Sequence, residues 1–196
     1  MTTAERGMSL IESMLAVSLM FTLTGLTVPT FVSALDASRS MAAARYVAAQ
    51  AGLARMQAAT LATRVALRFE VDGGSYRYQL YMDGNGDGVR ATDIATGIDL
   101  PLGPPERLED RFTGMSFAIG ASVAPVGTDA PAGPDADAVR LGASDLLSFS
   151  PFGTATSGTI YLRSRQGRQY AVRILGATGR VRVLEYSHET GEWLNR

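Results

Sequence analysis

The chain has 196 residues and carries 18 basic against 19 acidic side chains, which leaves a net charge of −1. This length allows one ordinary domain and an appendage, and the balanced charge does not indicate that the whole chain binds nucleic acid. There is no Cys, which excludes disulfides, thiolate metal sites and Cys nucleophiles. His188 is the only His and no G-x-S-x-G motif occurs, so we expect no Ser/His/Asp triad and predict that the chain is not an enzyme.

The first long element is an apolar run. Residues 13–35 contain no Asp, Glu or Arg, and as a helix they would span about 35 Å, enough to cross the ~30 Å hydrocarbon core of a membrane. The alternative is a secreted β-domain released by cleavage after Ala34, because Val32-Ser33-Ala34 has the small-x-small pattern of a signal-peptide site. Against it, the run is longer than the roughly 7 to 15 apolar residues of such peptides, and Glu12 directly precedes it. The sequence therefore favours a retained membrane helix.

Residues 36–63 are expected to continue this helix in amphipathic form. They are dense in Ala and contain no Pro, and Ala, Leu, Met, Arg and Gln are strong helix formers. An apolar stripe recurs at spacings of three and four and comprises Val47, Ala51, Ala54, Ala58 and Leu61. We predict one helix from Ser9 to about Thr63, roughly 80 Å long. Only its C-terminal half carries a stripe that the chain's own domain can cover.

The N-terminal segment Gly7-Met8-Ser9-Leu10-Ile11-Glu12 resembles the cleavage and methylation motif of type IV prepilins and type II secretion prepseudopilins. In that family a Gly precedes the cut, an apolar residue becomes the new N-terminus, and a Glu stands fifth after the cut. The resemblance implies that prepilin peptidase removes the leader, residues 1–7, and that Met8, where Phe is usual, becomes N-methylated. Residues 8–35 would then be the transmembrane and assembly half of the helix, in which Pro29 stands where the family often has a helix-loosening Pro.

The resemblance also implies a role for Glu12. In a fibre of staggered helices, the carboxylate of Glu12 in an incoming subunit would lie beside the Met8 amine of its neighbour. At about 4 Å and an effective dielectric near 20, this attraction is on the order of 4 kcal/mol before desolvation is subtracted. The alternative is an interfacial carboxylate that extends to the membrane surface without a partner. Glu12, Met8 and Pro29 are therefore the expected assembly residues.

From residue 64 onwards the apolar period changes from 3.6 to 2, which indicates strands. Strands are expected over residues 64–71, 76–82, 114–120, 146–151, 158–164, 169–175 and 180–186. Asp72-Gly73-Gly74-Ser75 joins the first two as a hairpin, and the last three form an antiparallel meander. Residues 120–138 are rich in Gly, Ala, Pro and Asp and are expected to be a mobile loop. Residues 64–196 therefore form a β-rich globular head.

Residues 146–186 resemble the GspH/FimT class of minor pilin-like proteins. The resemblance lies in two turns, Phe149-Ser150-Pro151-Phe152-Gly153 and Thr178-Gly179-Arg180-Val181, the second of which lies between paired strands. It implies an α+β, pilin-like fold, in which a long N-terminal α-helix packs on a C-terminal antiparallel β-rich head.

One loop of the head has the pattern of a calcium site. In Asp83-Gly84-Asn85-Gly86-Asp87-Gly88-Val89, side-chain oxygens stand at loop positions one, three and five, a Gly at six and a backbone carbonyl at seven, as in an EF-hand loop. Position twelve is Ile94 and not the bidentate Glu, so Asp93 or Asp99 would have to complete the ligand shell. The alternative is a polar hairpin turn. We expect no obligatory cofactor, and Ca²⁺ is the candidate ligand of Asp83, Asn85, Asp87, Val89 and Asp93.

The C-terminal strands carry a cluster of Arg. No acidic residue occurs between Asp145 and Glu185, and alternation along the strands places several of these Arg on one sheet face. The candidates for contact with DNA or a partner protein are Arg163, Arg165, Arg173, Arg180 and Arg182. Such a face can hold phosphates. A solvated surface, or one that pairs with an acidic neighbouring subunit, is the alternative.

These features and resemblances together predict a minor pseudopilin of the GspH type in a type II secretion system. It would be a single-pass protein of the bacterial inner membrane, in contact with lipid before assembly and with its head in the periplasm. Its expected partners are other pseudopilin subunits, prepilin peptidase and the inner-membrane assembly platform, and it would initiate or cap the pseudopilus that drives export of folded proteins. The alternative is a FimT-like minor pilin of a type IV pilus that binds DNA in natural transformation.

Overall fold

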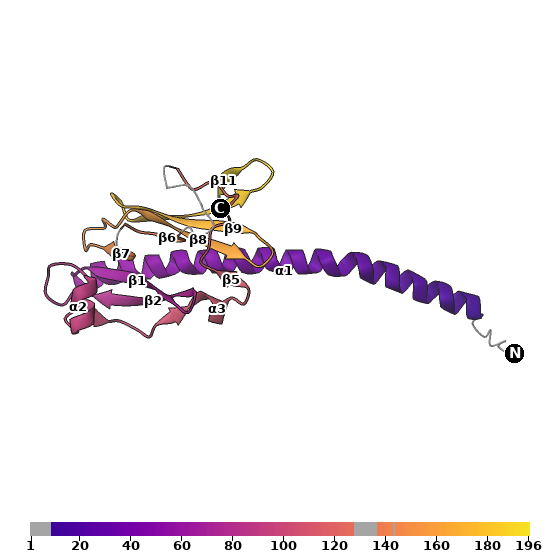
Figure 1. Cartoon of the computed structure of the whole chain (residues 1–196), viewed down its shortest axis with the longest axis horizontal. Coiled ribbons are helices and arrows are strands. Elements are labelled where there is room, and N and C mark those ends of the chain that lie inside the picture. Colours follow the sequence, from indigo (N-terminus) through magenta and orange to yellow (C-terminus); the bar gives the residue numbers. More distant parts are fainter. Residues whose placement is uncertain (1–8, 128–136, 143) are drawn as a thin grey trace, which may run out of the picture. The chain divides into compact units, whose positions relative to one another are not determined.

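The computed structural model describes residues 9–127, 137–142 and 144–196, apart from the side chains of Leu26 and Pro29. A long helix, α1 (Leu10–Leu61), is followed by two antiparallel sheets and two short helices (Figure 1). This confirms the predicted α+β layout. The chain divides into two compact units, Met1–Ser38 and Arg39–Arg196, so α1 contributes its N-terminal half to the first unit and its C-terminal half to the second, the head.

The N-terminal half of α1 satisfies its threonine hydroxyls within the helix. Thr22, Thr24 and Thr27 each donate to the carbonyl oxygen four residues earlier, at 2.7–2.9 Å. Such bonds satisfy the hydroxyl without water. They therefore suit a helix in an apolar environment, which offers the hydroxyl no other hydrogen-bond partner. The backbone stays helical through Pro29, although Pro removes one N–H donor from the helix.

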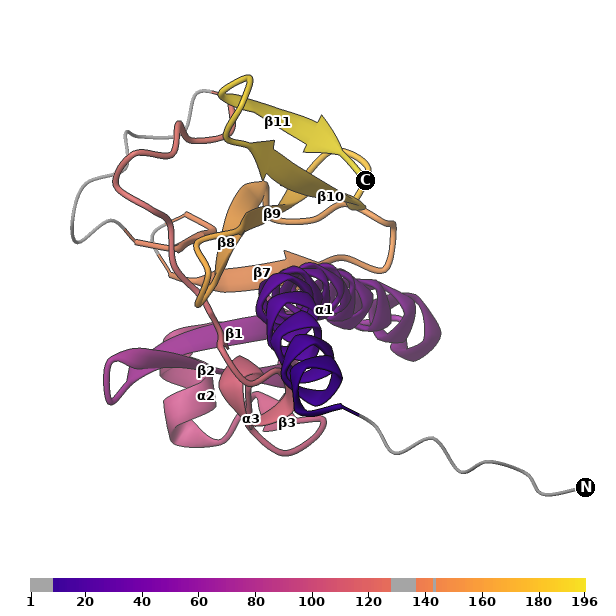
Figure 2. The same ribbon diagram turned by 90° about the vertical axis from the view of Figure 1, so that its right-hand side faces the viewer.

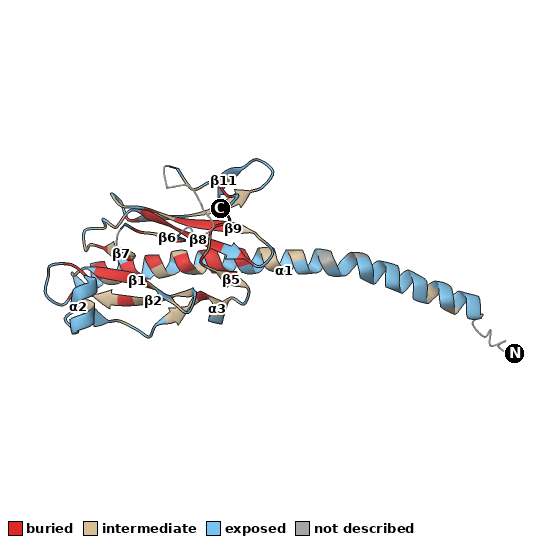
Figure 3. Cartoon of the chain, viewed as in Figure 1, coloured by how far each residue is buried: buried red, intermediate tan, exposed pale blue. Residues whose placement is uncertain are grey.

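The C-terminal half of α1 buries a stripe of small side chains in the head (Figure 3). The buried members are Ala43, Ala44, Val47, Ala51, Ala54 and Ala58. Because Ala adds only a methyl group, the strands can approach the helix backbone closely. Leu61 was predicted in this stripe but is 44 % exposed, so that prediction was wrong. The reason is that α1 ends at Leu61 and Ala62 takes a positive φ of 51°, which turns the chain out of the helix.

The first sheet has the strand order β3-β2-β1-β7, and β4 also pairs with β2. Its strands are β1 (Val65–Asp72), β2 (Ser75–Met82), β3 (Leu100–Pro101), β4 (Glu106–Arg107) and β7 (Leu146–Phe149). Gly73 and Gly74 join β1 to β2 as predicted, and both have positive φ, which a two-residue type I′ hairpin turn requires. The short helices α2 (Ala91–Thr96) and α3 (Leu108–Arg111) follow β2 and β4 in the chain.

The second sheet has the strand order β11-β10-β9-β8-β5, and β6 also pairs with β8. Its strands are β5 (Met115–Ser116), β6 (Val139–Arg140), β8 (Gly158–Ser164), β9 (Gln169–Leu175), β10 (Arg180–Ser187) and β11 (Glu192–Asn195). The predicted meander corresponds to β8, β9 and β10. The strand expected over residues 114–120 is reduced to β5, because Phe117 turns into the core and packs edge-to-face with Phe69 at 5.6 Å.

One hydrophobic core joins the C-terminal half of α1 to both sheets. The two sheets lie on either side of this part of the helix (Figures 1 and 2). Tyr161 and Tyr170 of the second sheet and Phe149 of the first are almost fully buried in it. The head therefore contains a core of its own.

Candidate functional site

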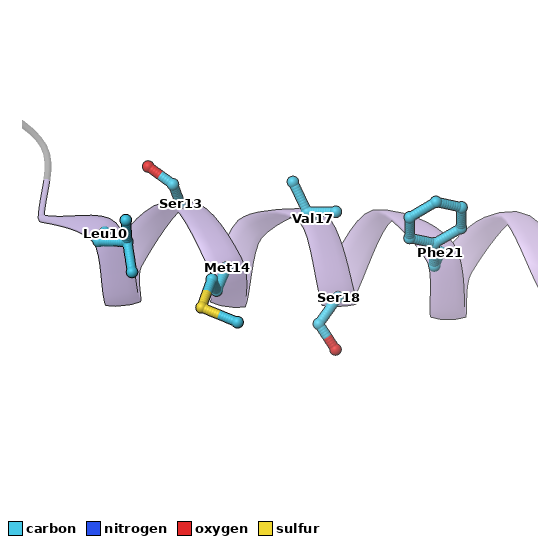
Figure 4. A pocket seen from close by; sticks show the side chains of 6 residues that line it. All are labelled: Leu10, Ser13, Met14, Val17, Ser18 and Phe21. Atoms are coloured by element: carbon cyan, nitrogen blue, oxygen red, sulfur yellow. The ribbon is translucent and has the colours of Figure 1, made fainter.

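Most described residues in the N-terminal half of α1 are exposed (Figure 3). Large apolar side chains are among them, with Leu10 exposed at 80 % and Phe21 at 74 %. Figure 4 shows the side chains that line a shallow groove formed by this helix alone: Leu10, Ser13, Met14, Val17, Ser18 and Phe21. By length and composition, α1 is apolar enough to cross a membrane. An apolar surface of this length requires lipid or other helices to cover it.

Glu12 is the only charged residue of α1 before Asp36. It lies in the first turn of the helix, where the helix dipole favours a negative charge. Its side chain is exposed and has no hydrogen bond or ion pair with any residue that the structure describes. Gly7 and Met8, the predicted cleavage and methylation site, lie outside the described residues. The cut and the pairing of Glu12 with an amine therefore stay predictions.

The Asp83 loop is closed by hydrogen bonds from backbone N–H groups to two carboxylates. Asp83 accepts three of these groups and Asp99 accepts two. The donors are Asn85, Gly86 and Gly88 for Asp83, at 2.7–3.2 Å, and Gly84 and Arg90 for Asp99, at 2.8–3.0 Å. Both carboxylates are buried, at 6 % and 1 % exposure. The five donors compensate the burial of these two polar groups.

The predicted calcium ligands are brought together only in part. Asp83 Oδ1 accepts two N–H groups, which occupies both of its lone pairs, and Asp87 Oδ2 pairs with Arg90 Nη1 at 2.8 Å. Asp93 lies on α2, whereas Asp99 joins the Asp83 loop. Within the described residues there is no group of three or more His, Asp or Glu side chains placed to hold a metal. The loop supports itself in this conformation, and Ca²⁺ binding stays a prediction.

The other two predicted calcium ligands have structural contacts. The side-chain oxygen of Asn85 accepts the N–H group of Asp87 at 3.2 Å. Val89 is buried with Ala66 and Leu146 in a small second apolar cluster. Val89 therefore anchors the end of the loop to β1 and β7.

Four of the five predicted contact arginines share one face of the second sheet, as alternation predicted. They are Arg163, Arg173, Arg180 and Arg182. Arg173 lies opposite Thr159 on one side and Arg182 on the other. Arg165, the fifth, lies in the turn after β8, where its N–H group donates to the Gly114 carbonyl at 2.8 Å.

A loop crosses this face and divides the arginines into two groups. Residues 117–127 contact the face at Tyr161, whose hydroxyl accepts the Val126 N–H group at 2.9 Å. Trp193 Nε1 donates to the Ala124 carbonyl at 2.7 Å and holds the loop from the other side. The sequence could not show this, because the crossing depends on contacts between distant segments. The single Arg face that alternation predicted is therefore interrupted.

The loop predicted as mobile over residues 120–138 is described only at its ends. Val123 and Ala138 are both buried in the core. Residues 128–136 lie outside the described residues. The two described ends therefore contribute to packing.

The first arginine group lines a groove of about 560 Å³. Arg163 and Arg165 lie in this groove together with Glu109, whose Oε1 accepts the Ser75 hydroxyl at 2.6 Å. Neither arginine forms an ion pair with a described residue. The groove therefore carries two basic side chains and one acidic side chain beside β5.

The second group forms a row across four strands. Arg140 lies opposite Thr159, Thr159 opposite Arg173, and Arg173 opposite Arg182. The Arg140 guanidinium also lies 5.3 Å from the ring centroid of Tyr161, a cation–π contact. Sequence reasoning missed Arg140, because β6 has only two residues and gives no alternating pattern.

A partly buried polar cluster ties α1 to β4 and was also missed. The Tyr46 hydroxyl donates to Glu106 Oε2 at 2.5 Å, and Gln50 Nε2 donates to the Tyr46 hydroxyl at 2.7 Å. Burial, followed by the bond to Glu106, raises the pKa of Tyr46 above its ordinary value. The guanidinium of Arg111 lies 4.6 Å from the Tyr46 ring centroid. No sequence motif indicates these contacts, which hold the helix in the head.

Comparison with protein-family models, curated proteins and solved structures finds no match to this chain. Its fold is α+β, with a long N-terminal helix and antiparallel sheets. One helix of the described residues, α1, is long and apolar enough to cross a membrane.

Proposed function

We propose that this chain is a pilin-like fibre subunit, a minor pseudopilin of the GspH type in a type II secretion system. In this proposal the N-terminal half of α1 anchors the chain in the bacterial inner membrane until assembly, and the head lies in the periplasm. The subunit then helps to initiate or cap the pseudopilus that drives export of folded proteins.

The observation that carries the proposal is the contrast between the two halves of α1. The C-terminal half buries its small side chains in the head, whereas none of the most apolar window of the N-terminal half is buried. A helix with this contrast is suited to exchange lipid for the helices of other subunits. The back-bonded threonines and the lone Glu12 support the same role. A carboxylate on an apolar helix is stabilised by an opposite charge from outside the chain.

N-terminal sequencing and mass measurement of the protein extracted from membranes test the proposal. We expect a chain that starts at Met8 with one added methyl group. A start at Leu35 would instead assign the chain to the secreted β-domain alternative. An uncut chain in cells that contain prepilin peptidase would contradict the proposal.

The row of arginines favours a second candidate function, a FimT-like minor pilin that binds DNA. Removing one phosphate contact lowers the slope of log affinity against log salt by roughly 1. We therefore expect Arg182→Ala to weaken DNA binding of this kind with such a slope change. Arg165→Ala, on the far side of the crossing loop, is the matched control. If the unaltered protein does not bind DNA at low salt, this candidate is removed.

A further inference from the structure

The hairpin of β10 and β11 (Figure 2) carries opposite charges at its two ends. Arg180 and Arg182 stand at the start of β10, and Glu189 and Glu192 stand at the turn between the strands. All four residues are exposed, and none forms a side-chain hydrogen bond or ion pair with a residue that the structure describes. Two positive charges at one end therefore match two negative charges at the other.

The charge between the two ends is neutralised within the chain. Glu185, near the middle of β10, pairs with Arg196 Nε at 2.6 Å and lies 3.8 Å from Arg168 Nη1. It also accepts the Tyr170 hydroxyl at 3.0 Å. Glu185 therefore obtains its partners within the chain, whereas the four end charges have none among the residues that the structure describes.

The two ends of one hairpin are too far apart to neutralise each other. Glu192 lies opposite Ser187, five residues along β10 from Arg182, which is about 16 Å at ~3.3 Å per residue. The Debye length at physiological ionic strength is about 8 Å. The two ends of one hairpin are therefore screened from each other, whereas a second molecule can bring opposite charges close to them.

We infer that the head of a second copy of this chain binds end to end, with the Arg180–Arg182 end of one hairpin against the Glu189–Glu192 end of the next. This inference rests on the proposed fibre function and extends it, because at least two copies of this initiating or capping subunit would follow each other. Each contact uses two different surfaces of the chain, so it is heterologous and continues in one direction, as in a fibre.

A second copy accounts for both ends of the hairpin. DNA would use only the basic end and would leave the acidic end without a role. Exposed ion pairs contribute little affinity, but they fix register and orientation between surfaces that other contacts hold together. In the fibre, the apolar half of α1 supplies those other contacts.

Disulfide cross-linking of the full-length chain in membranes tests this contact. The chain has no Cys, and Thr178 and Thr190 are exposed in the turns at the two ends of β10. A chain with both Thr178→Cys and Thr190→Cys should give a ladder of dimers, trimers and larger species after oxidation. Each single substitution should give no cross-linked species, because like ends do not meet. Dimers from either single variant would overturn the head-to-tail contact.

Charge reversal in the same double-Cys chain tests the pairing itself. Arg180→Glu with Arg182→Glu makes both ends acidic, and Glu189→Arg with Glu192→Arg makes both ends basic. Either pair of reversals should lower the cross-linked yield by at least about tenfold. Mixing the two reversed chains should restore it, since an acidic end then meets a basic end. Unchanged yields, or no recovery on mixing, would overturn the inference.

A second reporter separates this inference from the proposed function. Ala16→Cys places a thiol on the apolar half of α1, where helices of a fibre would meet. If Ala16→Cys cross-links but the Thr178/Thr190 pair does not, the fibre stands and the head contact fails. If neither cross-links, the proposed fibre function and the head contact both fail.

Discussion

At the scale of single residues, three carboxylates differ in how their charge is balanced. Asp83 and Asp99 are buried and accept backbone N–H groups of their own loop. Glu12 is exposed on an apolar helix and has no partner among the described residues. The first two should therefore determine the stability of the head, and the third should determine contacts with other molecules.

Replacement of Glu12 tests its assembly role. We expect Glu12→Ala to insert into the membrane and to lose its leader normally, but to be absent from purified fibres. The reason is that the neighbouring subunit's amine would lose its counter-charge. Immunoblots of membranes and of sheared fibres measure both steps, with Ser13→Ala as the control. Normal incorporation of Glu12→Ala would contradict the pairing.

Replacement of Asp99 tests the closed loop. In Asp99→Asn, one of the two backbone donors faces an amide NH₂ group, so we expect a loss of about 1–3 kcal/mol in the free energy of unfolding. Asp87→Asn, which alters an exposed ion pair with Arg90, should change it by less than about 1 kcal/mol. Urea unfolding measures both.

The same loop offers a direct test of Ca²⁺. If the ion binds the loop, millimolar Ca²⁺ should raise the melting temperature of the unaltered protein and should not raise that of Asp83→Asn. No shift in either protein would reject the calcium site.

Tyr170 makes the stability of the head depend on pH in the alkaline range. Burial, followed by the hydrogen bond to Glu185, raises the pKa of Tyr170 from 10.0 to about 12. Because the folded-state pKa is the higher one, this stabilisation is complete below about pH 10 and is lost as the pH rises to about 12. Between about pH 10 and 11, the free energy of unfolding of Tyr170→Phe should therefore fall less steeply than that of the unaltered protein, by up to ~1.4 kcal/mol per pH unit. Equal slopes of unfolding free energy against pH would refute this assignment.

At the scale of elements, the apolar pattern of the sequence predicted the helices and strands that are determined by neighbouring residues. Apolar periodicity located α1 to within two residues at each end, and it located the β1–β2 hairpin and the β8–β9–β10 meander. It did not locate β11, whose Glu192–Asn195 segment is short and polar, or α2, which has only six residues. The division of the arginine face depends on the Trp193–Ala124 contact between residues 69 positions apart. These two residues are too far apart in the sequence for a local pattern to relate them.

The small side chains of α1 make the helix sensitive to added volume. Ala54 is fully buried in the core, so Ala54→Leu should destabilise the head by about 1–3 kcal/mol through overpacking. Ala49 lies on the exposed side of the same helix, and Ala49→Leu should change stability by less than about 0.5 kcal/mol. Thermal unfolding of both variants measures the difference. Equal destabilisation would show that helix propensity, and not packing, is the cause.

At the scale of the whole molecule, the chain combines a head that has its own core with a helix half that has none. The core cluster begins at Ala43 and includes residues of both sheets. No described residue before Ser40 belongs to the buried set. The two halves of α1 should therefore be separable by truncation.

Deletion of residues 1–38 is expected to leave a folded head, because Arg39–Arg196 retains the complete core. Circular dichroism should show one cooperative thermal transition. Deletion of residues 1–50 also removes Ala43, Ala44 and Val47 from that core, and the transition should be lost or shifted to a much lower temperature. A shorter chain that unfolds like the first would contradict the role of α1 in the core.

Trp193 is the only Trp in the chain, and it holds the loop that crosses the arginine face. Its indole donates to Ala124, and its ring lies 5.2 Å from that of Tyr186 and 5.8 Å from that of Tyr161. The protein therefore contains a built-in fluorescent reporter at the place where its two arginine groups are separated. A partner that lifts the loop would expose the indole to water and shift its emission to longer wavelength, so binding at this face can be followed without a label.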